Sequence, residues 1–397
     1  MRRIQTLPQT AFPRLRKSRI VASPMQGCLG GVQSHRILMK KVIYHWLPSS
    51  ALGGIEMAAL SLIQGTPEAR HIVATGDARG PAVALWREAG AEIVHVSGWH
   101  GALGLSWYLH WKTFVKRCDV RHLIVWSPTR LPQLLAPLSR ESQCIVHIGN
   151  VGVFSFRARL QHRLMSWAYR PVCRPTLVAC SHVVAASIEA EPVFAGLPRI
   201  VIPNPVRAVF LKLGDERPVL SAAPRLWGML ARLDKLKDHH TLIEAVRRLP
   251  EGVEFHLEIA GDGLLAEELR KQVAEAGLGR RVRFLGALAQ PQEAMGQWDA
   301  FVFATTAGEG FGIAAAEAMA SRLPCVLSDV PAMREIAGSC AYYAAPASPA
   351  DLCARIMEVI ECPAIARHRA EQGKLRAQKL FGAETFSMRY LSVLKLA

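Results

Sequence analysis

Two glutamates, Glu309 and Glu317, bracket a glycine-bordered turn that leads into a run of alanines. Gly310 and Gly312 have no Cβ, so the backbone there can approach a ligand closely before Phe311 and the alanines begin a helix. The first N–H groups of a helix have no partner within it and attract a phosphate or a sugar oxygen. The helical rise separates the two carboxylates by roughly 12 Å at most, the span of an extended ligand. The spacing predicts a ligand site, the alternative being a capping acid followed by a solvent-facing glutamate.

A second candidate is a pair of bases. Arg232 and Lys237 follow the strand-like run Leu226–Ala231 and precede a helix-like segment. In such a loop an arginine fork and a lysine point charge suit a diphosphate. Bases in loops are otherwise usually solvated, and Asp238 is equally well explained as a helix N-cap.

Glycines mark two further turns. Gly53 and Gly54 lie between the first strand-like run and a helix, where the backbone can approach a phosphate or a sugar. The dinucleotide fingerprint Gly-x-Gly-x-x-Gly is absent, so a simple turn is the alternative. Gly261 and Gly263 follow another strand-like run, and we interpret them as part of a turn and helix cap.

His147 lies near the end of the apolar strand-like run Cys144–Ile148. A histidine at the carboxyl end of a strand can donate to a sugar hydroxyl or to a developing charge. A structural histidine is the alternative. No His, Cys or carboxylate cluster has metal-ligand spacing and no Walker A sequence occurs, so we expect neither a metal nor a cofactor.

Short apolar runs alternate with amphipathic stretches from Lys41 onward, which predicts parallel α/β structure. The expected strands are Val42–Leu47, His71–Thr75, Glu92–Val96, His122–Trp126, Cys144–Ile148, Thr176–Cys180, Arg199–Ile202, Leu226–Ala231, Phe255–Ala260, Val282–Leu285, Ala300–Ala304, Cys325–Ser328 and Cys340–Tyr343. The expected helices include Glu56–Gln64, Pro81–Ala89, Leu105–Val115, Ala158–Tyr169, Val183–Ala190, Ala350–Ile360 and Ala364–Leu394, the last two polar enough to be peripheral.

The alternation is interrupted between Pro203 and Pro224, where prolines indicate a hinge. We therefore predict two doubly wound Rossmann-like domains that face each other across a cleft, since ligands of such sheets bind beyond the carboxyl ends of the strands. The expected organisation is a basic, disordered extension (1–38), an acceptor domain (39–206), a linker (207–224) and a donor domain (225–397), with the option that the last helix crosses back to the first domain.

The 397 residues carry a formal net charge of +16, and the whole excess of bases lies before residue 211. A basic surface of this kind draws a protein to anionic lipid or to a polyanionic substrate. Nucleic acid is not expected, because no interleaved basic and aromatic motif or zinc-finger spacing occurs. Arginines at solvated positions of an arginine-rich sequence are the alternative.

The nine cysteines are scattered and never form a Cys-x-x-Cys pair. This favours reduced thiols in a cytoplasmic protein. No apolar run is long enough to span a bilayer, and the basic start has no apolar core of a signal peptide. We expect a cytoplasmic protein, bound peripherally to the inner face of the plasma membrane.

Taken in order, these pieces resemble the retaining nucleotide-sugar glycosyltransferases of glycosyltransferase family 4, which have the GT-B fold. The resemblance runs from Met39 to the end of the chain. It rests on Gly53-Gly54-Ile55-Glu56, Ile202-Pro203-Asn204-Pro205-Val206, Arg232 with Lys237, Ala260-Gly261-Asp262-Gly263, Val282-Arg283-Phe284-Leu285-Gly286 and the Glu-x₇-Glu element from Glu309 to Glu317. The sequence departs from the family pattern at Ala231, Arg322 and Thr305-Thr306, which puts the shape of the donor pocket in doubt.

The resemblance implies a role for each site residue. Arg232 and Lys237 would hold the donor diphosphate without a metal, and Glu317 would bind the ribose. Glu309 would orient the hexose together with the backbone of Gly310, Phe311 and Gly312, and His147 would lie near the reacting centre. Gly53 and Gly54 would close on the phosphates.

The resemblance also implies the reaction. The predicted enzyme transfers a hexose from a UDP- or GDP-sugar to a glycan or lipid-linked acceptor in cell-surface polysaccharide or lipopolysaccharide synthesis, with retention of configuration. A nucleotide-sugar epimerase of the same fold and a non-catalytic GT-B scaffold protein are the alternatives.

Overall fold

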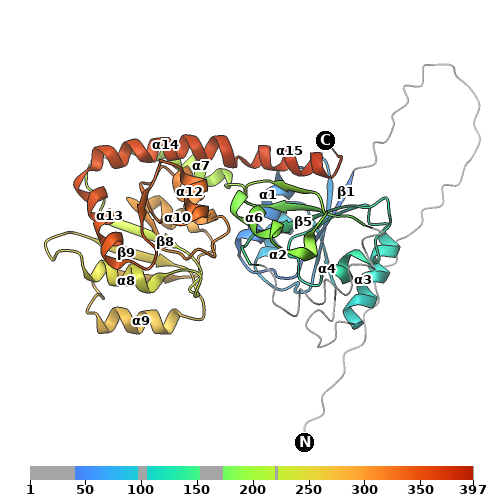
Figure 1. Ribbon diagram of the computed structural model, residues 1–397, viewed down its shortest axis with the longest axis horizontal. Coiled ribbons are helices and arrows are strands. Elements are labelled where there is room, and N and C mark those ends of the chain that lie inside the picture. Colours follow the sequence, from blue (N-terminus) through green and yellow to red (C-terminus); the bar gives the residue numbers. More distant parts are fainter. Residues whose placement is uncertain (1–40, 97–104, 153–172, 220–221, 397) are drawn as a thin grey trace, which may run out of the picture. The chain divides into compact units, whose positions relative to one another are not determined.

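The computed structural model describes residues 41–96, 105–152, 173–219 and 222–396. The predicted basic extension and the predicted helix at 158–169 lie outside the described residues. Within them the chain forms two parallel sheets with helices on their faces (Figure 1).

The first sheet has seven parallel strands in the order β3-β2-β1-β4-β5-β6-β7. The strands are β1 (Val42–Leu47), β2 (Arg70–Thr75), β3 (Glu92–His95), β4 (His122–Val125), β5 (Gln143–Ile148), β6 (Thr176–Ala179) and β7 (Arg199–Val201). The helices of this half are α1 (Gly54–Gln64), α2 (Ala82–Glu88), α3 (Leu105–Cys118), α4 (Leu131–Leu135) and α6 (His182–Glu189), with the 3₁₀ turn η1 (Pro192–Phe194). The strand order reverses between β1 and β4, which in a doubly wound sheet opens a crevice at the carboxyl ends of the strands.

The second sheet has six parallel strands in the order β10-β9-β8-β11-β12-β13. The strands are β8 (Leu226–Leu230), β9 (His256–Ala260), β10 (Val282–Gly286), β11 (Ala300–Phe303), β12 (Cys325–Ser328) and β13 (Tyr342–Ala344). The helices that follow residue 206 in the chain are α7 (Ala208–Glu216), α8 (His239–Arg247), α9 (Ala266–Glu275), α10 (Pro291–Gln297), α11 (Ile313–Ala320), α12 (Pro331–Ala337), α13 (Pro349–Glu361), α14 (Pro363–Phe381) and α15 (Ala383–Val393). The order reverses between β8 and β11, so the loops after these two strands border the second crevice.

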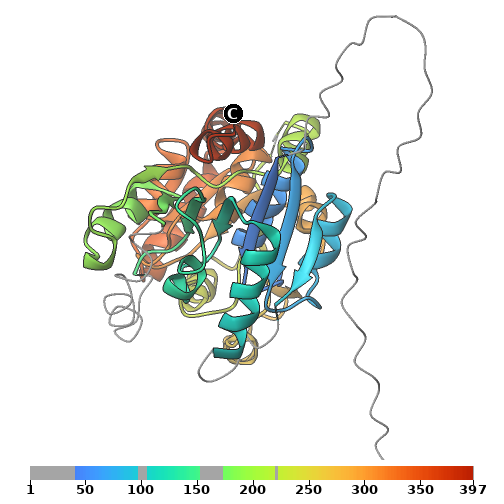
Figure 2. The ribbon, with the colours of Figure 1, turned by 90° about the vertical axis from the view of Figure 1, so that its right-hand side faces the viewer.

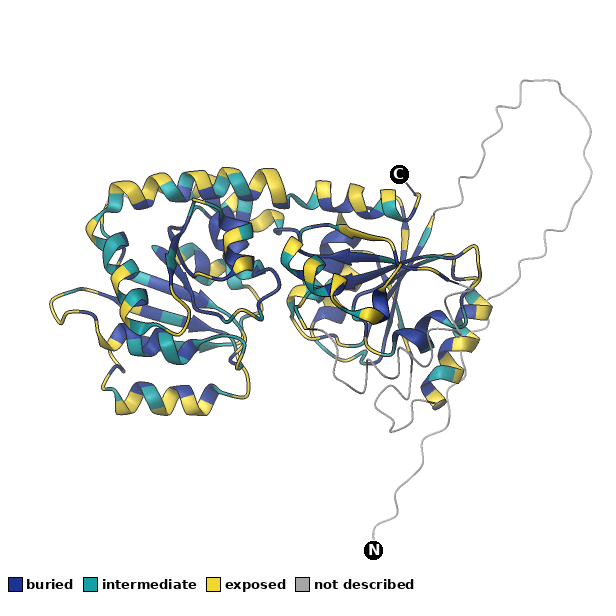
Figure 3. Ribbon diagram, viewed as in Figure 1, coloured by how far each residue is buried: buried dark blue, intermediate teal, exposed yellow. Residues whose placement is uncertain are grey.

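All thirteen predicted strands occur, with bounds that agree to within two residues. They are easy to predict because both faces of a parallel sheet are covered, so each strand is a short and nearly continuous apolar run. The burial pattern in Figure 3 shows this, with the strands buried and the exposed residues on the outer sides of the helices.

The segment predicted as a linker differs from the expectation, because residues 207–224 include helix α7. This helix contacts α11 and α14, and it buries Phe210 beneath the second sheet. Prolines on either side of α7 hide its amphipathic pattern in the sequence.

The predicted helix Ala364–Leu394 is two helices that meet at Gly382. The expectation that this region is peripheral is wrong for α15, which contacts α1 and buries Phe386 and Tyr390 in the core of the first sheet. Val206 pairs with Gly382, so the two crossings of the chain between the sheets lie side by side. Figure 2 gives a second view of α14 and α15, in red, beside the strands.

Candidate active site

The loop between β11 and α11 carries Glu309, whose relative exposure is only 6%. Its Oε1 accepts hydrogen bonds from the backbone N–H groups of Gly310, at 3.1 Å, and Phe311, at 3.3 Å. Helix α11 begins two residues later than expected, at Ile313, because Gly312 takes a left-handed conformation with φ 83°. The N–H groups of Gly310 and Phe311, which precede the helix, thus hold the Glu309 carboxylate in one orientation.

Lys237 forms an ion pair with the other oxygen of this carboxylate, Oε2. The lysine side chain is 12% exposed, and its ammonium lies 4.7 Å from the centre of the Phe303 ring. Two hydrogen bonds fasten the loop after β8 to the loop after β11: Asp238 N–H to the Ala304 carbonyl, at 3.1 Å, and Thr306 N–H to the Leu236 carbonyl, at 3.1 Å. A buried ion pair offsets its desolvation only where other contacts fix its geometry, and these loops provide them.

Arg232 lies in the same loop as Lys237 but does not contact Glu309. Its side chain is 71% exposed, and its Nη2 is 3.0 Å from Asp234. The Arg232 charge also acts on Glu56 in the first turn of α1: burial raises the pKa of Glu56, and Arg232 opposes that shift. The guanidinium is thus paired with Asp234 but remains largely exposed to solvent.

Gly261 and Gly263 support this loop, a role that differs from the predicted turn and helix cap. A Cβ at Gly261 would lie 1.8 Å from the Ala231 carbonyl oxygen, and one at Gly263 would lie 2.4 Å from that of Leu233. Helix α9 begins only at Ala266, so neither glycine caps it. Their missing side chains instead let the loop after β8 come close to the loop after β9.

Three departures from the family pattern have structural counterparts. Arg322 has φ 58°, a left-handed conformation that favours glycine, and its guanidinium lies 3.2 Å from Glu371 of α14. The Thr305 hydroxyl donates to the Leu236 carbonyl at 3.0 Å, so it helps to fasten the two loops. The Ala231 carbonyl oxygen lies against Gly261, where a Cβ would come within 1.8 Å of it.

Helix α1 begins at Gly54, with Gly53 as its N-cap, and a Cβ at either position would meet the end of a flexible side chain. A Cβ at Gly54 would lie 2.7 Å from Ile313 Cδ1, and one at Gly53 would lie 2.5 Å from Glu56 Oε2.

Gly310 links the Glu309 loop to the carboxyl ends of β5 and β6. Its carbonyl accepts a hydrogen bond from the Ser181 hydroxyl at 2.6 Å. A Cβ at Gly310 would lie 2.2 Å from the Gly149 carbonyl oxygen, so only glycine fits there.

His147, at the end of β5, has no exposed surface. Its Nδ1 lies 2.8 Å from the Tyr390 hydroxyl of α15. Burial lowers the pKa of His147 to about 4, so the ring is neutral at physiological pH. Within the described residues its Nε2 has no hydrogen-bond partner, and this atom lies next to Gly149.

Glu317 is on α11, as predicted, but the structure does not bring it to Glu309 and Lys237. Its Oε1 accepts a hydrogen bond from Arg207 Nε at 2.8 Å, and the side chain is 5% exposed. Sequence analysis missed Arg207, although it directly follows the crossover segment that carries part of the family resemblance.

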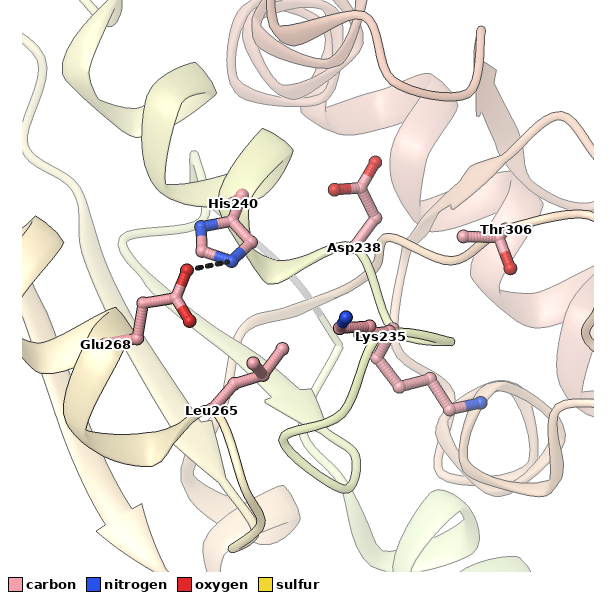
Figure 4. Close-up of a pocket in the computed structure, with 7 residues that line it drawn as sticks. Lys235, Asp238, His240, Leu265, Glu268 and Thr306 are labelled. Atoms are coloured by element: carbon pink, nitrogen blue, oxygen red, sulfur yellow. Dashed lines mark ion pairs between the residues drawn. The ribbon is translucent and has the colours of Figure 1, made fainter.

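A pocket of about 350 Å³ opens beside Lys237 (Figure 4). On one side of the close-up His240 and Glu268 form an ion pair with a separation of 3.4 Å, and Thr306 lies on the opposite side. Asp238 is the N-cap of α8, as predicted, since it accepts from Thr241 N–H at 3.2 Å. The lining residues are Lys235, Lys237, Asp238, His240, Leu265, Glu268 and Thr306.

Among the described residues, no group of His, Cys, Asp and Glu side chains is arranged to hold a metal ion. The eight cysteines that the structure describes are free thiols. None of the described helices has both the length and the apolar character needed to cross a bilayer.

The second sheet and most of its helices lie in a region that matches a known protein family. Residues 216–376 match the model of the family described as glycosyl transferases group 1. The matched residues lie in the C-terminal half of the chain, which is similar to this family there. The matched region contains Arg232, Lys237, Glu309 and Glu317.

Two curated relatives illustrate the likeness. The putative glycosyltransferase EpsF of Bacillus subtilis is 38% identical over 27% of this chain and 28% of its own length. The GDP-mannose:cellobiosyl-diphosphopolyprenol alpha-mannosyltransferase of Xanthomonas campestris is 28% identical over 44% of this chain and 47% of its own. The chain thus spans less than half the length of either relative.

Solved structures cover more of the chain. HepE of Anabaena, in complex with UDP and glucose, has a TM-score of 0.74 at 20% identity over 90% of this chain and 100% of its own. The lipopolysaccharide outer core galactosyltransferase WaaB has a TM-score of 0.65 at 17% identity over the same shares. These neighbours and the two Rossmann-like sheets confirm the predicted GT-B fold.

Proposed function

We propose that the protein is a retaining glycosyltransferase that moves a hexose from a nucleotide-diphosphate sugar to a glycan or lipid-linked acceptor. The observation that carries this proposal is the buried pair of Lys237 and Glu309. It joins the loops after β8 and β11, the neighbouring strands at which the order of the second sheet reverses. Ligands of doubly wound sheets bind at such a reversal, and this one bears a cation beside an open pocket.

The roles of the side chains follow from their exposure. Arg232 projects into solvent and meets the diphosphate as a fork, while Lys237 neutralises the charge that develops on the leaving nucleotide. Two cationic side chains perform the task that a divalent metal performs elsewhere, so we propose a reaction without a metal.

Glu309 orients the hexose, because its carboxylate is fixed by the backbone of Gly310 and Phe311. We propose that retention is achieved by attack of the acceptor from the same face that the diphosphate leaves. The departing diphosphate then takes the proton of the acceptor hydroxyl. We propose that Glu317 contacts the ribose. Because Glu317 is buried and paired with Arg207, this role requires its side chain to become accessible when the donor binds.

The identity of the nucleotide is open to a direct test by thermal shift. HepE is solved with UDP, and the Xanthomonas campestris relative is named for GDP-mannose. We expect one of UDP-glucose or GDP-mannose to raise the melting temperature, because a ligand that binds only the folded state stabilises it by about 2.7 kcal/mol at 100 times its Kd. No shift with either sugar nucleotide, nor with UDP or GDP alone, would support a non-catalytic scaffold. Turnover of the bound sugar without any acceptor would support an epimerase.

Names of two relatives, which include diphosphopolyprenol and diphospho-undecaprenol, support a lipid-linked acceptor and a role in cell-surface polysaccharide synthesis. We propose that the protein reaches such an acceptor by binding the anionic membrane surface peripherally through α3. This helix buries Trp107 and Trp111, and it exposes Lys112, Lys116 and Arg117 beside the 54% exposed Leu109. A basic face with an apolar side chain fits a surface of anionic lipid headgroups.

Flotation with vesicles tests this docking face. The triple variant Lys112→Gln, Lys116→Gln and Arg117→Gln is expected to bind vesicles of phosphatidylglycerol and phosphatidylcholine about 100-fold more weakly than the wild type. A matched control removes three exposed bases from the other half of the chain: Lys271→Gln, Arg280→Gln and Lys379→Gln. Equal vesicle binding by the two triple variants would contradict the proposal. So would wild-type binding that stays the same at high salt or with vesicles of neutral lipid.

A further inference from the structure

A buried hydrogen bond ties the C-terminal helix α15 to the histidine of the proposed site. The Tyr390 hydroxyl and His147 Nδ1 are 2.8 Å apart, and neither residue has exposed surface. The Tyr390 ring stacks on Trp126, with centroids 5.6 Å apart, and contacts Phe386 at 4.6 Å. The ring is thus held on two sides, and its hydroxyl has little freedom to turn elsewhere.

The direction of this hydrogen bond follows from what each group can donate. Burial raises the pKa of Tyr390 well above its usual value, so the hydroxyl keeps its proton. Among the described residues, His147 Nδ1 is its one hydrogen-bond partner. If Nδ1 carried a proton instead, the tyrosine proton would be left without an acceptor in the core, which is unfavourable. Tyr390 therefore donates, Nδ1 accepts, and the neutral imidazole carries its proton on Nε2.

The proton on Nε2 has no acceptor among the described residues. A Cβ at Gly149 would lie 3.5 Å from this atom, and Gly149 in turn abuts Gly310 of the Glu309 loop. A buried N–H group that has no hydrogen-bond partner and lies beside a ligand site can donate its hydrogen bond to an oxygen of the ligand.

We propose that Tyr390 is a positioning residue that fixes His147 as the Nε2–H tautomer, so that His147 donates a hydrogen bond to a hydroxyl oxygen of the transferred sugar. This inference rests on the proposed function for the identity of the acceptor oxygen. The tautomer itself is a property of the protein without substrate.

A second histidine provides an internal reference. The Trp126 indole, which can only donate, bonds His45 Nδ1 at 3.1 Å, so His45 must also carry its proton on Nε2. His45 Nε2 then donates to His71 Nδ1 at 2.9 Å. This pair does not include Tyr390, and changes at α15 should leave the His45 tautomer unchanged.

Nitrogen-15 NMR of histidine-labelled full-length protein tests the tautomer. In the wild type we expect His147 and His45 to give the pattern of Nε2–H imidazoles. In Tyr390→Phe we expect His147 to become a mixture of tautomers, while His45 stays unchanged. The control is Ser387→Ala, one turn earlier on α15, which removes a buried hydroxyl that has no partner among the described residues. An Nδ1–H signal from His147 in the wild type, or an unchanged tautomer in Tyr390→Phe, would overturn the proposal.

Kinetics separate this role from a structural one. We expect Tyr390→Phe to lower kcat about 10-fold, with a melting temperature close to that of Ser387→Ala. His147→Gln, whose amide can still donate, should keep more activity than His147→Leu, so His147 remains testable even if Tyr390→Phe does not fold. Equal activity of His147→Gln, His147→Leu and the wild type would overturn the donor role. If the tautomers are as expected but the protein binds no sugar nucleotide, the proposed function is refuted. A sugar hydroxyl is then also excluded as the hydrogen-bond acceptor of His147, whereas the positioning of His147 by Tyr390 still holds.

Discussion

Replacement of Lys237 by methionine is expected to lower kcat for sugar transfer by about 10²–10³-fold, the cost of removing one preorganised charge from a developing anion. The ammonium is the charged group nearest to Glu309, and it lines the pocket into which the diphosphate is proposed to bind. Methionine keeps the length of the side chain and its contact with Phe303, so the loss isolates the charge. Initial rates at saturating donor would give the change in kcat directly.

The matched control is Lys235→Met, which removes an exposed lysine that lines the same pocket two residues earlier. We expect a much smaller loss of kcat for Lys235→Met. A lysine charge that is solvated and not held in one position contributes little to the stability of the transition state. Glu309→Gln should preserve the hydrogen bonds from Gly310 and Phe311 while it removes the charge partner of Lys237. If folded Lys237→Met transfers sugar at the wild-type rate, the proposed site is wrong.

Arg207→Met is expected to destabilise the fold by about 3–5 kcal/mol, the typical cost of leaving one member of a buried ion pair without its partner. Arg207 Nε lies 2.8 Å from Glu317 Oε1, and the arginine also lies over the Phe210 ring at 4.6 Å. The side chains are 21% and 5% exposed. Denaturant unfolding followed by circular dichroism would measure the change in the free energy of unfolding.

The same variant should show a defined pH dependence. Burial raises the pKa of Glu317 and Arg207 opposes that shift, so loss of Arg207 raises the pKa further. A carboxyl group whose pKa is higher in the folded protein than in the unfolded chain holds its proton more tightly in the folded state. The stability that this gives is fully present below the pKa of the unfolded state, and it is lost as the pH rises through the pKa of the folded state. The destabilisation by Arg207→Met is therefore expected to be larger at about pH 8 than at about pH 5.

Two controls identify the buried pair as the cause. Lys212→Met breaks an exposed pair with Glu216 on the same helix region and should leave the free energy of unfolding essentially unchanged. The double variant Arg207→Met and Glu317→Leu should recover much of the stability, because apolar side chains can replace a buried pair. Equal destabilisation by the single and double variants would show that packing of Arg207, rather than its charge, stabilises this region.

Much of the architecture was accessible from local pattern alone. The strands were predictable because each is a short apolar run between polar segments, and parallel sheets bury both faces of such runs. The same locality explains why Glu309, Lys237 and His147 could be singled out: each lies just after or at the end of a strand, where the crevice of a doubly wound sheet is found.

Elements whose role depends on distant partners were not predictable in this way. Helix α15 has both polar and apolar residues, and it buries Tyr390 because Gly382 ends α14 and the chain returns to the first sheet. Glu317 seemed equivalent to Glu309 in the sequence, yet it is paired with Arg207, a residue 110 positions away. Periodicity identifies which face of a helix is apolar but not what that face meets.

The amino-acid sequence by itself determined the order of strands and helices, the GT-B architecture and the loops that carry the acidic and basic side chains, because these follow from local apolar runs, glycines and caps. Only the tertiary structure decided which charges are joined. It paired Lys237 with Glu309, left Arg232 in solvent, gave Glu317 to Arg207 and brought Tyr390 to His147. Electrostatic and hydrogen-bond energies depend on separations of a few ångströms and on burial, and both are set by how distant segments fold against one another.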